Sequence, residues 1–154
     1  MRKKNFPSWF HDSLKECALE RLARDDGCSL RFRGNRCVLV RIDRCVDSAL
    51  APTKKCDFAV VSENATCLVE FVCGRARPRD AEEAIEKFEA TEGVLRKRGA
   101  IKGKCERVLY TMSLTSTLAQ NLRLYTGRLG GKVLQGHHGE LRILSGKAFL
   151  LPVG

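Results

Sequence analysis

Two short, almost entirely apolar runs constrain the fold of this chain more than any other feature. Residues 56–62 and 66–72 are rich in β-branched and aromatic side chains, and Glu63-Asn64-Ala65 separates them. Runs of this length and composition, bounded by turn residues, are typical of buried strands. We therefore predict two neighbouring strands at the centre of a sheet.

The segment 79–98 has the clearest helical pattern in the chain. Acidic residues crowd its first turns, and basic residues precede Gly99 at its end, as the helix dipole favours. Apolar residues recur along one face: Ala81, Ala84, Ile85, Phe88 and Leu95. This segment is predicted to be an amphipathic helix.

Similar patterns predict the remaining elements. Apolar residues at helical spacing predict a first helix over 8–26, and strands over 28–33 and 36–43 flank Gly34-Asn35, a hairpin turn signal. Further predictions are a strand at 105–112, a helix at 115–125, and short strands at 132–135 and 140–144. The element order α-β-β-β-β-α-β-α-β-β favours an α/β (α+β) fold, a mixed β-sheet flanked by helices, in a single domain over 1–154.

The net charge of the chain indicates which class of partner it attracts. The 154 residues carry a net charge of +10, and the basic surplus lies in 1–44 and 96–154, whereas acids predominate in 45–95. A positive potential of this size attracts polyanions. No apolar run approaches the roughly 20 residues of a membrane span, and no apolar signal core follows the basic N-terminus. We expect a soluble, cytoplasmic protein that does not contact membranes.

The eight cysteines include no C-x-x-C pair, which argues against a zinc site, so no metal ligand is assigned to them. Disulfides are one alternative: a two-residue loop at Asn64-Ala65 would place Cys56 opposite Cys73. Small buried hydrophobic side chains are the other. The spacing alone leaves both open.

Asp57 opens one predicted central strand, and Glu70 lies in the next, in the sequence Leu68-Val69-Glu70-Phe71-Val72. This arrangement, with the helix, strands, helix and strand around it, resembles the PD-(D/E)XK nuclease superfamily over residues 8–112. The resemblance implies that the two acids hold a divalent metal such as Mg²⁺ and that a lysine two residues after the glutamate activates water.

Val72 occupies the position of that lysine, and a valine cannot replace it. Lys87, Arg75 and Arg77 are candidate substitutes, and Glu16 or Glu20 is a candidate additional acid. Without the lysine, the sequence favours binding of nucleic acid without cleavage and without a cofactor. The alternative is a Mg²⁺-dependent nuclease or junction resolvase that uses Asp57 and Glu70.

Phosphate binding requires Lys or Arg along a groove, and single strands also require flat side chains for stacking. The stacking candidates are Trp9, Phe10 and Tyr110. The basic candidates fall into three clusters: Arg31, Arg33 and Arg36; Arg75, Arg77 and Arg79; and Lys102 with Lys104.

The basic, cysteine-containing chain, with its aromatic N-terminus and its arginine-rich hairpin, also resembles the ThermoDBP-related proteins of hyperthermophilic archaea. That resemblance implies a homo-oligomer that binds single-stranded DNA with little sequence preference. The residues themselves leave DNA and RNA as alternative partners.

Overall fold

The computed structural model describes residues 5–20, 22–25, 28–33, 37–45, 54–136, 138–144 and 147–151. Its larger sheet has six strands in the order β1 (Ala18–Leu19), β4 (Cys37–Arg41), β5 (Phe58–Ser62), β6 (Ala65–Ala76), β7 (Lys104–Leu114) and β8 (Lys132–Gln135). A second sheet has the order β10 (Lys147–Leu151), β9 (His138–Leu144), β3 (Cys28–Arg33) and β2 (Leu22–Asp25). The predicted class, a mixed α/β fold with helices flanking a sheet, is confirmed.

The helices are short except for one. They are the 3₁₀-helix η1 (Asp12–Cys17), α1 (Pro78–Lys97), α2 (Ser116–Gln120) and α3 (Leu122–Leu129). No helix in the described ranges is both long and apolar enough to cross a membrane.

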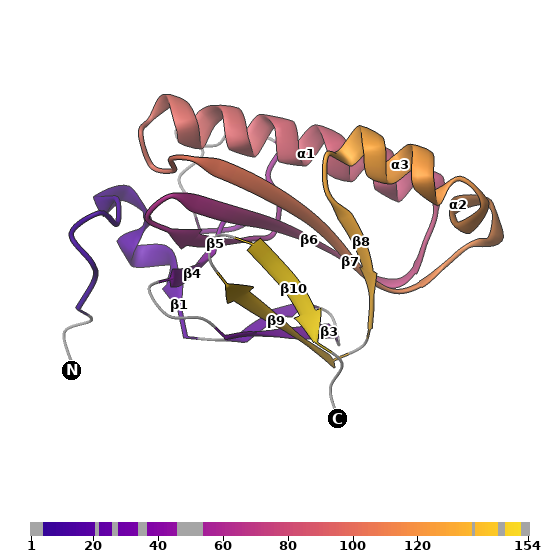
Figure 1. Cartoon of the computed structure of the whole chain (residues 1–154), viewed down its shortest axis with the longest axis horizontal. Coiled ribbons are helices and arrows are strands. Elements are labelled where there is room, and N and C mark those ends of the chain that lie inside the picture. The colour runs from indigo at the N-terminus through magenta and orange to yellow at the C-terminus, as the bar shows by residue number, and fades with distance from the viewer. Residues whose placement is uncertain are drawn as a thin grey trace.

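The centre of the large sheet combines two kinds of connection. Strands β4, β5 and β6 are antiparallel neighbours, whereas β7 pairs with β6 in parallel after the crossover through α1. A parallel pair needs such a crossover because β7 must begin at the same end of the sheet as β6. Helix α1 therefore lies across one face of the sheet, as Figure 1 shows.

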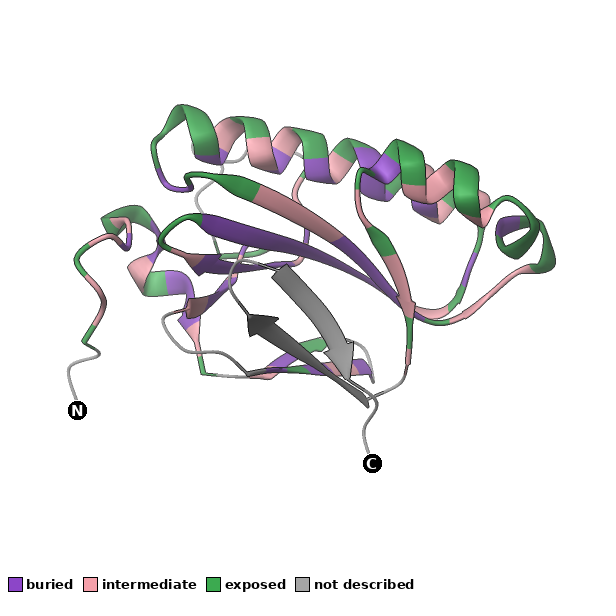
Figure 2. Cartoon of the chain, viewed as in Figure 1, coloured by how far each residue is buried: buried purple, intermediate pink, exposed green. Residues whose placement is uncertain are grey.

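Three layers result from this topology. Helices α1 and α3 cover one face of the six-stranded sheet, and the second sheet covers the other (Figure 1). The central strands between these layers are buried, while the outer side of α1 is exposed (Figure 2).

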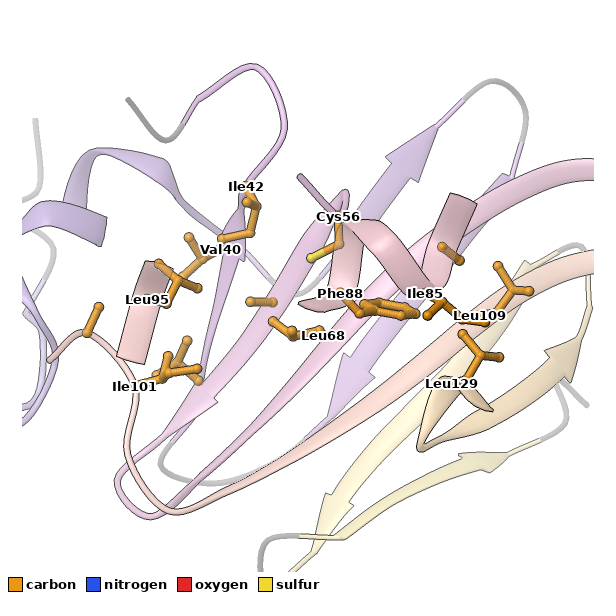
Figure 3. Packing of buried hydrophobic residues seen from close by; sticks show 14 of the residues in the cluster. Val40, Ile42, Cys56, Leu68, Ile85, Phe88, Leu95, Ile101, Leu109 and Leu129 are labelled. Carbon is orange, nitrogen blue, oxygen red and sulfur yellow. The ribbon is translucent and has the colours of Figure 1, made fainter. Parts of the chain in front are cut away.

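Each face of the large sheet has its own apolar cluster. On the helix side, Ile85 and Phe88 of α1 pack on Leu68 and Leu109 of the sheet (Figure 3). On the other side, residues of β5, β6 and β7 pack against the second sheet, and this cluster includes Phe58, Phe71, Tyr110, Leu30 and Phe32.

The central elements agree with the sequence predictions. Strands β5 and β6 form the predicted hairpin, and α1 and β7 cover the predicted helix and strand. The predicted helix at 115–125 is two helices, α2 and α3, that meet at Asn121. Strand β10 was not predicted.

Two predictions in the N-terminal part are wrong. Among the described residues of 8–26, only Asp12–Cys17 is helical, and it is a 3₁₀-helix that leads into β1 and β2. The proposed hairpin around Gly34-Asn35 is also absent, because β3 pairs with β2 and β9 whereas β4 pairs with β1 and β5. The two strands exist, but they belong to different sheets.

A disulfide joins Cys17, at the end of η1, to Cys45, with their Cα atoms 5.7 Å apart. The pairing of Cys56 with Cys73 does not occur, and both remain thiols. The β5–β6 turn places Val61 opposite Thr66, so Cys73 falls beyond Cys56 rather than opposite it. The two side chains also join clusters on opposite faces of the sheet.

Candidate functional site

Asp57 and Glu70 meet at the start of β5. Phe58 pairs with Val69, so the preceding residue Asp57 faces Glu70 across the antiparallel pair. The Asp57 backbone N–H donates to Glu70 Oε1 at 3.2 Å. The Phe71 backbone N–H donates to Asp57 Oδ2 at 2.8 Å. Both carboxylates are therefore oriented by backbone groups of the neighbouring strand.

Lys87 of α1 reaches this pair of acids from above the sheet. Its Nζ donates to Glu70 Oε2 at 2.7 Å. The Glu70 side chain is only 6% exposed, whereas that of Lys87 is 35% exposed. The structure thus brings a buried carboxylate, a second carboxylate and a partly solvent-accessible ammonium group into one cluster, the Asp57–Glu70–Lys87 site.

Burial and neighbouring charges have opposing effects on the pKa values of Glu70 and Lys87. Burial, and then the negative charge of Asp57, raise the pKa of Glu70 to about 8, because together they outweigh the ion pair with Lys87. Burial opposes the charged form of Lys87, but its hydrogen bond to Glu70 and its attraction to the two acids raise its pKa. With both acids ionised, the site has more negative charge than one lysine neutralises.

Neighbouring backbone contacts hold Asp57 in place. Its carbonyl oxygen accepts from the N–H groups of Ile42 at 2.9 Å and Asp43 at 3.3 Å. One residue earlier, the Cys56 N–H donates to Thr91 Oγ1, at 3.0 Å, on α1. The start of β5 is therefore fixed both to the end of β4 and to the helix that carries Lys87.

Val72 lies where the resemblance would place a lysine, and it packs against the helix-side cluster. Of the three candidate substitutes, Lys87 is the one that contacts Glu70. Arg75 and Arg77 are exposed, and the Arg77 guanidinium lies 3.7 Å from Asp80. The sequence signal for Lys87 is its place beside Phe88, at the margin of the apolar face of α1.

The predicted basic residues do not form one surface. Arg75, Arg77 and Arg79 are exposed where β6 ends and α1 begins. Lys102 and Lys104 are exposed at the other end of β6, where the Lys104 N–H donates to the Asn64 carbonyl. These two clusters lie on either side of the Asp57–Glu70–Lys87 site along the strand.

The third basic cluster lies elsewhere. Arg31 is exposed on β3 of the second sheet, and the large sheet separates this strand from α1. The backbone of Arg33 ends the same strand, and Arg36 lies outside the described residues. Of this predicted cluster, the structure describes the side chain of Arg31 alone, and Arg31 does not lie beside the acids.

Two of the three aromatic candidates are core residues. Phe10 is 3% exposed in the helix-side cluster, and Tyr110 is 1% exposed in the other. Neither ring presents a face to solvent, so the structure gives neither a stacking surface. Trp9 is half-buried, with its ring at an edge-on angle to Phe10.

Glu20, the candidate additional acid, does not approach Asp57. Because the chain leaves η1 as strands β1 and β2 rather than as a continuous helix, Glu20 lies at the corner between the two sheets. There it lines a cavity with residues of β3 and β4. In the described ranges, no three His, Cys, Asp or Glu residues come together as a metal-binding group.

No family model, curated protein or solved structure matches this chain.

Proposed function

We propose that the chain is a divalent-metal-dependent nuclease whose reaction centre is the Asp57–Glu70–Lys87 site. The observation that carries the proposal is the 2.7 Å contact between Lys87 Nζ and Glu70 Oε2. It supplies, from α1, the cationic group that the strand itself lacks at Val72. Hydrolysis of a phosphodiester needs a positive group near both the nucleophile and the developing negative charge.

The two carboxylates fit a Mg²⁺ ion by their chemistry. Mg²⁺ is commonly bound in proteins by one or two carboxylates and completes its shell with water, so a third acid is not required. Asp57 and Glu70 repel each other, and Glu70 is buried, which raises its pKa. A cation held by both acids would relieve that repulsion. When bound, Mg²⁺ lowers the pKa of coordinated water and stabilises phosphate charge.

The protein's own groups have distinct tasks in this proposal. The Phe71 and Asp57 N–H groups orient the carboxylates of Asp57 and Glu70, which would hold the metal. The Lys87 ammonium group, partly open to solvent, would orient the attacking water and stabilise a phosphate oxygen. The hydrogen bond from Cys56 to Thr91 fixes the spacing between helix and strand on which this arrangement depends.

Nucleic acid is the proposed substrate because of the charge around the site. The chain has a net charge of +10, and exposed arginines follow Glu70 at the end of β6 and the start of α1. Such side chains bind phosphates through charge-assisted, often bidentate, hydrogen bonds. Arg75, Arg77 and Arg79 would thus hold the backbone of a strand whose phosphodiester lies at Glu70.

The test is incubation of the purified protein with labelled single-stranded and duplex DNA and RNA, with Mg²⁺, with Mn²⁺ or with EDTA. We expect metal-dependent fragments. Asp57→Asn should abolish cleavage, and Lys87→Met should lower the cleavage rate by about 10²- to 10⁴-fold. Lys97→Met is the matched control, because Lys97 is an exposed lysine on the same helix and should retain the wild-type rate.

A second candidate function is binding of single-stranded DNA without cleavage. The favouring observation is that Lys87 already neutralises part of the negative charge at Glu70, where a metal would bind. The same incubation separates the two proposals. A band shift that weakens steeply with salt, on strands that stay intact with every metal, supports the binding protein and contradicts the nuclease.

A further inference from the structure

One short turn connects the Cys17–Cys45 disulfide to the Asp57–Glu70–Lys87 site. This turn, residues 42–45, follows β4 directly, and the Cys45 N–H donates to the Ile42 carbonyl at 3.4 Å. Its first two residues, Ile42 and Asp43, donate their N–H groups to the Asp57 carbonyl. Its last residue forms the disulfide with Cys17, at the end of η1. The 42–45 turn therefore contacts the disulfide at one end and Asp57 at the other.

The 42–45 turn contains an unfavourable backbone conformation. Arg44 has a φ of 65°, and among the described residues it is the only one other than glycine with a positive φ. The left-handed region is disfavoured for a residue with a Cβ atom, so such a conformation persists where its surroundings hold it. On one side of Arg44, Ile42 is fully buried in the helix-side cluster (Figure 3). On the other side, the disulfide holds Cys45.

We propose that reduction of the Cys17–Cys45 disulfide weakens the binding of a divalent metal at the Asp57–Glu70–Lys87 site. The inference rests on the proposed function, because it assigns a redox control to the same site. Without the disulfide, Arg44 can leave the left-handed region, and the N–H groups of the turn then shift relative to the Asp57 carbonyl. Asp57 loses part of its support, so its carboxylate is less well positioned opposite that of Glu70.

The contacts that reduction would disturb lie next to a metal ligand rather than on the metal. Hydrogen bonds in this position orient the ligand, and their loss typically lowers metal affinity by about 10- to 100-fold. The turn donates two such bonds to the Asp57 carbonyl, at 2.9 Å and 3.3 Å. The bond from the Phe71 N–H to Asp57 Oδ2 does not involve the turn and would remain. We therefore expect weaker metal binding after reduction, not its complete loss.

The two residues of the disulfide differ in their access to solvent. Cys45 is exposed, whereas Cys17 is only 5% exposed. A thiolate of a dithiol reductant would attack Cys45 Sγ, break the S–S bond and release Cys17 as a thiolate, which takes up a proton. The second thiol of the reductant then displaces the Cys45 thiol and closes a disulfide within the reductant. The protein gains two thiols, and the dithiol is oxidised.

The experiment is a Mn²⁺ titration of the full chain before and after treatment with dithiothreitol, with free Mn²⁺ measured by electron paramagnetic resonance. The dithiothreitol is removed under anaerobic conditions before the titration. We expect reduction to weaken Mn²⁺ binding by about 10- to 100-fold, and the untreated double variant Cys17→Ala/Cys45→Ala to bind as weakly as the reduced chain. Cys37→Ala is the matched control, because Cys37 is a thiol at the other end of β4, and it should behave like wild type in both states.

Arg44→Gly tests whether the 42–45 turn links the disulfide to the site. Glycine adopts the left-handed conformation without a Cβ penalty, so the turn of this variant should keep its shape after reduction. We expect its Mn²⁺ affinity to fall by less than about threefold on treatment with dithiothreitol. A fall as large as that of wild type would overturn the inference. Loss of the far-UV circular dichroism of the reduced wild-type chain would also overturn it, because the bond would then act on the whole fold.

Cleavage assays on the same samples separate this inference from the proposed function. An oxidised chain that binds Mn²⁺ and cuts nucleic acid, with unchanged affinity after reduction, contradicts the redox control alone. An oxidised chain that neither binds Mn²⁺ nor cuts contradicts the nuclease and the redox control together. If the oxidised chain binds Mn²⁺ without cutting, the nuclease proposal fails, and the comparison of the two affinities still decides the redox control.

Discussion

The two faces of the six-stranded sheet are covered differently, and among the described residues only the face under α1 contains a buried charged side chain. Glu70 is the one buried carboxylate among the described residues, and it lies on the helix side with Lys87 above it. The buried cluster under the second sheet consists of apolar residues and Tyr110, whose hydroxyl is buried without a hydrogen-bond partner in the described ranges.

The contrast shows what each kind of cover can supply. A helix that packs across a sheet can lay the aliphatic part of a lysine side chain along the apolar surface and place its ammonium group at a buried acid. A packed sheet presents its side chains roughly perpendicular to its plane, so a polar atom beneath it depends on a partner directly opposite. A charged site is therefore easier to build under α1.

The largest expected effect concerns the packing of α1. Phe88 is fully buried between the helix and the sheet. Phe88→Ala should lower the free energy of unfolding by about 3–5 kcal/mol, measured by urea denaturation, because it removes apolar contacts and leaves a cavity. Glu89→Ala, at the exposed neighbouring position, should change it by less than about 0.5 kcal/mol. Similar values for the two variants would mean that α1 does not cover this face.

The disulfide should have the next largest effect. It closes a loop between residues 28 positions apart, which corresponds to about 3.5 kcal/mol through the restricted unfolded state. We expect a reducing agent to lower the urea midpoint of the wild-type chain by the amount that corresponds to this free energy. The same agent should not change the urea midpoint of the double variant Cys17→Ala/Cys45→Ala. A wild-type urea midpoint that does not change with reductant would show that the disulfide does not stabilise the folded chain.

Glu70 should make stability depend on pH. Its pKa in the folded protein, about 8, lies above the ordinary 4.5, so the folded chain keeps this proton longer than the unfolded chain. Its contribution to stability is therefore fully present below about pH 4.5 and is lost as the pH rises through 8.

Denaturation of metal-free protein between pH 4 and 9 measures this loss, as the difference between wild type and Glu70→Gln. The variant should lack the decline, since its amide does not titrate. Parallel curves for the two proteins would mean that the buried acid is already ionised and that the helix side tolerates the charge without cost.

The smallest effect is expected on the opposite face. Tyr110→Phe removes a buried hydroxyl without a partner and keeps the ring that packs on Phe71. Because an unsatisfied buried polar group costs free energy, the variant should be more stable by about 1 kcal/mol in urea denaturation. A loss of stability would show that this hydroxyl has a partner after all, and the two faces would then be more alike than their described contacts indicate.

The predictions from the sequence succeeded where local signals sufficed. Helix α1 has apolar periodicity, an initial proline and a terminal glycine, and all three act within the segment. The β5–β6 hairpin likewise needs only a short turn. The predicted helix over 8–26 failed because β1 is held by β4, and Cys17 by Cys45, contacts that no local pattern contains.

The residues of the candidate site show the same difference between local signals and long-range contacts. Asp57 and Glu70 were found because they lie in consecutive strands, so that one hairpin register sets their relative positions. Lys87 was one of three candidates, since the choice depends on how α1 crosses β6. The cavity that Glu20 lines could not be predicted from the sequence, because it depends on β3 and β4 belonging to different sheets.

The parallel pairing of β3 with β9 sets the order in which a nascent chain can fold. Arg31 pairs with Glu140, about 110 residues later, so the inner strand of the second sheet lacks one neighbour until those residues have been synthesised. By then β4 to β7 and α1 have left the ribosome, but the second sheet does not yet cover the apolar face of these strands. We expect chaperones to engage the chain during this interval, and slow codons placed after β8 should prolong it.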